Sequence, residues 1–117
     1  MKFCLIVLIS MFSVLANAEL YIFVSHSMND KALQAYYKEA QSLRAKLVVR
    51  GLIDDSFLET KAKLDDLSIS YDIDPNLFEK YDVQVVPTIV RDQNNRQSKV
   101  VGHILLIEAL KIFDNKL

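Results

Sequence analysis

A short stretch near the start of the chain, Ser25-His26-Ser27-Met28, gathers hydroxyl, imidazole and thioether groups. A serine and a histidine can act as a nucleophile and its base, but adjacent residues on a turn seldom point at one another, and no acidic residue is placed to orient the imidazole. We therefore expect no catalysis here and interpret His26 as an exposed loop side chain. His103 is expected at a helix start, because two histidines this far apart, with no cysteine or paired acidic motif, do not predict a metal site.

Thiol chemistry depends on the single cysteine, Cys4, which lies in a segment typical of an export signal. Lys2 gives a positive start, the apolar run that follows carries no charge, and Ala16-Asn17-Ala18 has the small-residue pattern of a cleavage site. The alternative is an uncleaved membrane anchor, but the run is shorter than the ~20 residues that a spanning helix needs. We expect a signal peptide over residues 1–18. The exported mature chain would begin at Glu19, have no thiol and be unable to exchange disulfides.

Residues 19–117 suit one domain with its own apolar core. The whole chain has 14 basic and 15 acidic residues, and removal of Lys2 leaves 13 against 15, a net charge of −2. This balance argues against nucleic acid as a partner, which would favour a clustered basic surface. We expect no cofactor.

A strand, a helix and a second strand must position the Ser25-to-Met28 stretch. Residues 20–24 form a continuous apolar run typical of a buried strand. A helix-start signal follows, with either Ser27 or Asn29 as its cap, and apolar residues at i, i+3 and i+4 spacing predict an amphipathic helix to about residue 45. Residues 46–51 are a second strand. The three elements predict a βαβ unit with parallel strands and a right-handed crossover.

The middle of the chain contains shorter elements. Ser56 and Glu59 have the spacing of a capping box and predict a second helix that fades near residues 65–66. Residues 68–71 fit either a short strand or the tail of the connection. Asp74-Pro75 supplies a cap and a proline at the first helical position, which predicts a helix of one or two turns.

Residues 83–90 are rich in β-branched side chains and predict a strand, although Pro87 interrupts them. A proline is tolerated there if the strand begins at it after a bend, or if the Val86–Pro87 bond is cis. The residues alone leave both alternatives open.

The end of the chain predicts a hairpin and a helix. A polar turn over residues 92–97 and a short strand over 99–101 would pair with the proline-bearing strand in antiparallel fashion. A last helix is expected over residues 104–113, with Ile104, Ile107, Leu110 and Phe113 on its apolar face.

This order of elements is that of the thioredoxin fold. Val86-Pro87-Thr88 resembles the Val-Pro-Thr segment that carries the cis-proline of that superfamily, and residues 100–104 resemble its last strand and helix start. The resemblance implies an α/β fold: a central mixed β-sheet, made of a βαβ unit followed by an antiparallel β-hairpin, flanked by helices. It also implies a cis bond before Pro87.

Four segments give a narrower resemblance. In chain order they are Val24-Ser25-His26-Ser27-Met28, Leu47-Val48-Val49-Arg50-Gly51-Leu52, Ile73-Asp74-Pro75-Asn76-Leu77-Phe78 and Val86-Pro87-Thr88. Behind an export signal, they are similar to the TrbC-type pilus assembly proteins of F-type conjugative transfer systems, although Asn29 replaces the proline usual in that family. The resemblance implies a periplasmic protein that helps to assemble the pilus of a type IV secretion machine and associates with a TraW-like partner.

Thioredoxin-like proteins have a groove between the loop before the cis-proline and the N-terminus of the first helix, where backbone can pair with an extended peptide. The resemblance makes these residues the candidate partner contacts: Ser25, His26, Ser27, Met28, Val86, Pro87 and Thr88. The alternative is that Pro87 only ends the sheet correctly. We interpret Arg50 as a structural charge that pairs with a carboxylate such as Asp54 or Asp74.

Two classes of function remain. The first is a non-catalytic protein of pilus assembly that acts through protein binding. The second is a generic periplasmic thioredoxin-like chaperone or a degenerate disulfide oxidoreductase.

Overall fold

The computed structural model describes residues 18–115, which contain one five-stranded sheet in the order β3-β2-β1-β4-β5. The strands are β1 (Ala18–Phe23), β2 (Lys46–Val49), β3 (Asp72–Ile73), β4 (Thr88–Gln93) and β5 (Arg96–Val101). β1 is parallel to β2 and antiparallel to β4, and β4 is antiparallel to β5. The predicted mixed sheet, with its βαβ unit and its hairpin, is confirmed.

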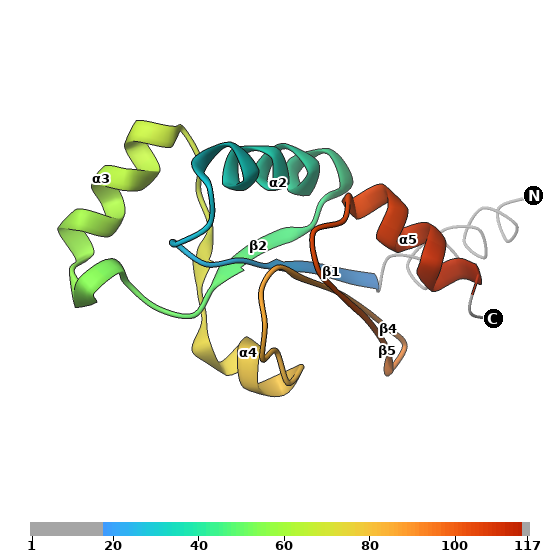
Figure 1. Cartoon of the computed structure of the whole chain (residues 1–117). Helices are drawn as coiled ribbons and strands as arrows, with labels where there is room; N and C mark the ends of the chain where they lie inside the picture. Colours follow the sequence, from blue (N-terminus) through green and yellow to red (C-terminus); the bar gives the residue numbers. More distant parts are fainter. Residues whose placement is uncertain (1–17, 116–117) are drawn as a thin grey trace, which may run out of the picture.

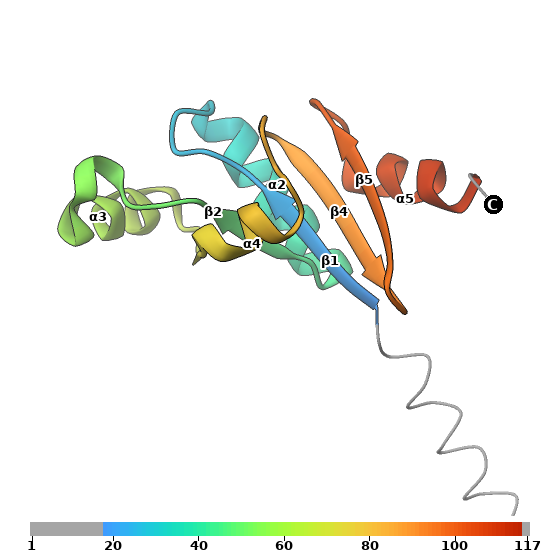
Figure 2. The same cartoon turned by 90° about the horizontal axis from the view of Figure 1, so that it is seen from below.

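Helices cover both faces of the sheet. Figure 1 shows α2 (Asp30–Leu43) and α5 (Leu106–Asn115) on one face and α4 (Pro75–Lys80) on the other. A short 3-10 turn, η1 (Ile53–Asp55), leads into α3 (Phe57–Leu67). Figure 2 shows α3 at the end of the molecule opposite to the β4–β5 hairpin.

The alternation of side chains along β1 divides the core into two layers. Ile22 and Val24 pack with α2 and α5, whereas Tyr21 and Phe23 pack with α4 on the opposite face. The Phe23 ring meets the Phe78 ring edge to face, with centroids 4.9 Å apart. Apolar residues on both faces of β1 are buried, so the end of this strand is held firmly in the core. The position of the loop that follows Val24 is therefore well defined at its start.

Three helix starts follow the local sequence signals. The Asn29 side chain, one of the two expected caps of α2, accepts the Lys31 amide at 2.8 Å. Ser56 caps α3 by accepting the Glu59 amide at 3.1 Å. Asp74 accepts two amides in the first turn of α4.

Other boundaries differ from the prediction. The segment before Pro87 is not strand, since β4 begins only at Thr88, and residues 68–71 belong to the connection before β3. α5 begins at Leu106, whose amide donates to Glu39 Oε2 at 2.9 Å. This start turns Leu106, Ala109 and Phe113 into the core and leaves Ile107 44% exposed, so the expected apolar face was wrong at Ile107.

The expected signal peptide lies outside the described residues except for Ala18, which pairs with Gln93 at the start of β1. Within the part of the chain that the structure describes, no helix has the length and apolar character needed to cross a membrane.

Candidate functional site

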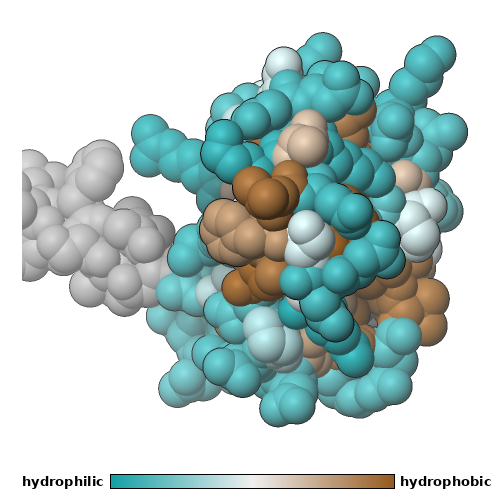
Figure 3. Space-filling model, turned by 90° about the vertical axis from the view of Figure 1, so that its left-hand side faces the viewer, coloured by the Kyte–Doolittle hydropathy of each residue, from teal (hydrophilic) through white to brown (hydrophobic). Residues whose placement is uncertain are grey.

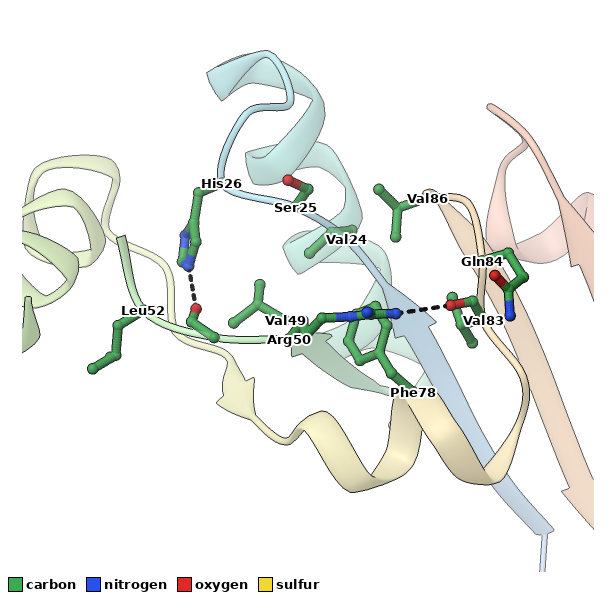
Figure 4. Close-up of a pocket in the computed structure, with 11 residues that line it drawn as sticks. Val24, Ser25, His26, Val49, Arg50, Leu52, Phe78, Val83, Gln84 and Val86 are labelled. Atoms are coloured by element: carbon green, nitrogen blue, oxygen red, sulfur yellow. Dashed lines mark hydrogen bonds between the residues drawn. The ribbon is translucent and has the colours of Figure 1, made fainter. Parts of the chain in front are cut away.

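A groove of about 460 Å³ lies where β1 and β2 end. Both strands point their carboxyl ends to this edge because they are parallel, and the loops that follow them form its walls. Figure 4 shows the lining side chains converging from β1, β2, α4 and the segment before Pro87. The lining residues are Val24, Ser25, His26, Val49, Arg50, Gly51, Leu52, Phe78, Val83, Gln84 and Val86.

The segment before β4 supplies one wall of this groove. The Val86–Pro87 peptide bond is cis, as the resemblance implied. Val86 lines the groove, while the side chains of Pro87 and Thr88 are buried, and the Thr88 hydroxyl donates to the Val85 carbonyl. Among the hydrogen bonds of residues 18–115, none uses the backbone amide or carbonyl of Val86. This residue therefore presents free backbone groups beside the groove.

The loop between β1 and α2 supplies the opposite wall. The hydroxyl oxygens of Ser25 and Ser27 are 2.9 Å apart, and Ser25 Oγ also accepts the Ser27 amide at 3.2 Å. Ser27 is exposed, whereas Met28 is half-buried and packs against the core layer beneath α2. The hydroxyls are hydrogen-bonded to each other and not to the imidazole, so the loop contains no serine–histidine pair.

His26 is not the exposed side chain that the sequence predicted. Its Nε2 lies 2.7 Å from the Gly51 carbonyl oxygen and its Nδ1 lies 2.6 Å from the Tyr71 hydroxyl. Because a carbonyl oxygen only accepts, Nε2 carries the hydrogen, and in the neutral ring Nδ1 accepts from Tyr71. The half-buried imidazole thus joins the groove loop to the end of β2 and to the segment before β3.

Two further groups support this arrangement. Burial raises the pKa of Tyr71 to about 12, so its hydroxyl keeps its proton at neutral pH. The backbone carbonyl of His26 accepts from Lys63 Nζ of α3, and Lys63 Nζ also lies 3.7 Å from an Asp30 carboxylate oxygen. The loop before α2 is therefore attached to α3 as well.

Arg50 has a different partner from the one expected. Its Nη2 donates to the Val83 carbonyl at 3.1 Å, and its guanidinium lies 4.9 Å from the Phe78 ring centroid. Asp74 instead caps α4, and no ion pair of Arg50 with Asp54 or Asp74 occurs among the described residues. The predicted pairing was wrong because Arg50 extends across the groove toward Val83 (Figure 4).

Among the described residues that line the groove, none has a side chain suited to disulfide exchange. That chemistry needs a thiolate, best placed at a helix start where the dipole lowers its pKa, and a second thiol to resolve the mixed disulfide. The corresponding loop before α2 contains Ser25, His26, Ser27 and Met28, and the one cysteine of the chain is Cys4. Hydroxyls, an imidazole and a thioether remain, together with the free backbone of Val86.

Some features of this end of the molecule were missed from the sequence. The links of His26 to Tyr71 and to Lys63 join residues 45 and 37 positions apart, and no local pattern marks them. Phe57 and Leu58, which were expected only as the start of a helix, are 71% and 80% exposed. Figure 3 shows hydrophobic residues gathered on this end of the molecule and surrounded by hydrophilic ones.

The sheet, the helices on both faces and the groove beside a cis-proline define a thioredoxin-like protein. Among solved structures, the exposed lipoprotein thioredoxin Etrx1 of Streptococcus pneumoniae strain TIGR4 is 17% identical, with a TM-score of 0.62 over 86% of this chain and 85% of that one. MTB DsbF is 13% identical, with a TM-score of 0.59 over 90% and 84% of the two chains. StoA from Bacillus subtilis is 11% identical, with a TM-score of 0.58 over 86% and 83%. At these identities the similarity concerns the fold alone.

The family is given by the sequence match. Residues 22–111 match the model of the type-F conjugative transfer system pilin assembly protein, and this chain belongs to that family. The match runs from β1 into α5 and so includes every residue that lines the groove. The family is one of pilin assembly proteins and not of enzymes. No curated protein matches the chain.

Proposed function

We propose that this protein is a non-catalytic factor of type-F pilus assembly that binds an extended segment of another assembly protein in the groove beside Pro87. It acts in the periplasm after removal of residues 1–18, and its partner is a TraW-like protein. The observation that carries the proposal is the free backbone of Val86 on a groove without thiols, in a member of a pilin assembly family.

An extended segment fits this site for a physical reason. Backbone amides and carbonyls that lack partners can pair with another chain in strand-like fashion, and neighbouring pockets then select its side chains. The groove combines apolar walls at Val24, Leu52 and Val86 with the polar Ser25 and Gln84. The proposed contact surface is therefore the part of the expected set that is exposed or half-buried, namely Ser25, His26, Ser27 and Val86. The other residues that line the groove, which the sequence did not reveal, complete this surface.

The alternative of a degenerate oxidoreductase has a direct test. Because residues 18–115 contain no cysteine, purified protein in an insulin-reduction assay should give only the background rate. Turnover by clean protein would contradict the proposed absence of catalysis.

The binding proposal is tested by filling the groove. Val86→Arg places a long charged side chain on the groove wall, whereas Ile107→Arg makes the same kind of change on α5, where the side chain is 44% exposed. Both variants should melt near the wild-type temperature in circular dichroism. In a conjugative strain that lacks the gene, only Ile107→Arg should restore pilus formation and co-purify with the TraW-like protein.

Each outcome decides the proposal. Normal pilus formation and co-purification by a folded Val86→Arg variant would exclude the groove as the contact surface. Loss of both by folded Val86→Arg, with normal behaviour of Ile107→Arg, is the result we expect. If the protein were instead a chaperone that binds many clients, the folded Val86→Arg variant would lose holdase activity toward unrelated proteins. This loss would occur both in cells that carry the transfer system and in cells that lack it.

A further inference from the structure

The groove has an unbalanced charge. Arg50 is exposed and is the one formal charge on its walls apart from the titratable His26, and no aspartate, glutamate or lysine is among the described residues that line it. The whole chain has more acidic than basic residues, so this cation differs from the protein's average surface. A lone cation in a concave site favours a negatively charged ligand.

The Arg50 guanidinium has N–H donors that are not used in hydrogen bonds among the described residues. It carries five N–H groups, and the structure records one hydrogen bond from it, to the Val83 carbonyl. That contact and the Phe78 ring beneath the guanidinium hold its plane in one orientation. A fixed guanidinium is well suited to a carboxylate, since two parallel N–H groups match the two carboxylate oxygens.

Nearby carboxylates do not fill this role. The Asp74 side chain accepts the amides of Asn76 and Leu77, and Asp82 accepts the side-chain amide of Gln84 at 2.6 Å. The four ion pairs found among residues 18–115 use other cations. Within the described part of the chain, Arg50 is thus held in place without an anionic partner of its own.

We propose that Arg50 anchors the carboxylate of an aspartate or glutamate side chain in the extended segment that the groove binds. The inference rests on the proposed function, since it names the chemistry of the partner at the same site. An internal acidic side chain fits better than a chain terminus, because strand-like pairing with Val86 needs backbone that continues past it in both directions. Arg50 is therefore the specificity-determining residue of the groove.

Overlapping synthetic peptides that cover the TraW-like protein and the pilin are the probes. The peptide that binds the purified wild-type protein most tightly is labelled with fluorescein and titrated by fluorescence anisotropy. Each of its acidic residues is then changed in turn to the matching amide. Arg50→Gln removes the charge but keeps an amide N–H that can reach toward Val83, and Arg96→Gln is the same change on exposed β5. Melting temperatures show that both variants are folded.

We expect Arg50→Gln to weaken binding about tenfold, as loss of a charge-assisted hydrogen bond does. One acid-to-amide change in the peptide should weaken binding by the same factor, and the two changes together should do no more than either alone. Arg96→Gln should bind like wild type. Added salt should weaken wild-type binding more than binding by Arg50→Gln.

The remaining outcomes separate this inference from the proposed function. If Val86→Arg abolishes peptide binding while Arg50→Gln and every acid-to-amide change leave it intact, the groove is the binding site and the role of Arg50 is wrong. If Val86→Arg leaves peptide binding intact, or if no peptide binds the wild-type protein, both the function and the inference are contradicted.

Discussion

The imidazole of His26 offers a quantitative test of how the groove loop is held. His26→Ala removes the 2.7 Å contact with the Gly51 carbonyl and the 2.6 Å contact with the Tyr71 hydroxyl. It also removes an edge-to-face ring contact with centroids 5.2 Å apart. A hydrogen bond contributes a net ~0.5–1.5 kcal/mol, and half-buried groups that regain water stay in the lower part of that range. We therefore expect the free energy of unfolding to fall by about 1.5 kcal/mol in this variant.

Tyr71→Phe removes one of these two hydrogen bonds and keeps the ring. It should cost about 1 kcal/mol, and the double variant His26→Ala/Tyr71→Phe should cost little more than His26→Ala alone. Tyr37→Phe is the matched control, because its hydroxyl accepts only an exposed hydrogen bond from Gln41. That control should change stability by less than about 0.5 kcal/mol.

Urea unfolding followed by circular dichroism at neutral pH measures the stability of the wild type and of all four variants. A loss of 1 kcal/mol lowers the melting temperature of a domain of this size by roughly 4–8 °C, so thermal melts give a second reading. Additive effects of His26→Ala and Tyr71→Phe would show that the two side chains do not interact in solution. A His26→Ala variant as stable as wild type would refute the view that the imidazole holds the loop.

Three other predictions concern the chain end, two residues near the groove and alkaline pH. Intact mass or N-terminal sequencing of protein recovered from the periplasmic fraction should give Glu19 as the first residue, and a membrane-bound chain that retains residues 1–18 would contradict the expected cleavage. Thr88→Arg should unfold the domain or lower its stability by several kcal/mol, because it forces a charge into a site that is 1% exposed. Ser27 is exposed, so Ser27→Arg should change stability by less than about 0.5 kcal/mol in the same urea unfolding experiment. Equal stabilities of the Thr88→Arg and Ser27→Arg variants would contradict this prediction. Since burial raises the pKa of Tyr71 from 10.0 to about 12, folding favours its neutral form, so this contribution to stability is complete below pH 10 and is lost as the pH rises toward 12. Tyr71→Phe should make unfolding less dependent on pH across that window, and an unchanged dependence would contradict the assignment.

Local sequence was enough to locate three of the helix starts. The caps at Asn29, Ser56 and Asp74 each act on an amide two or three residues further along, so a pattern of a few letters contains both partners. The order of the other elements could be predicted for a similar reason, because each of them carries its own periodicity, whereas the two-residue strand β3 is too short to show one and was not predicted. The cis bond before Pro87 came from resemblance, since the residues alone left two alternatives.

The side-chain contacts of the site could not be found in this way. His26 contacts Tyr71, and Arg50 contacts Val83, across separations of 45 and 33 residues. Which residues meet at such separations depends on how α3 and α4 pack at the end of the sheet. A nearby carboxylate in the sequence was therefore a poor guide to the partner of Arg50.

These long-range contacts bear on the choice between binding and catalysis. The loop before α2 uses its polar groups internally: the two serine hydroxyls bond to each other, and both imidazole nitrogens of His26 are bonded to Gly51 and Tyr71. A nucleophile must instead have a base within reach and face the substrate. The groups that remain free along the groove include the backbone of Val86 and the spare donors of Arg50, and these are suited to hydrogen bonding with another chain. A site whose reactive groups serve the structure, while its free groups suit an extended acidic segment, is better suited to holding a partner in an assembly than to turning over a substrate.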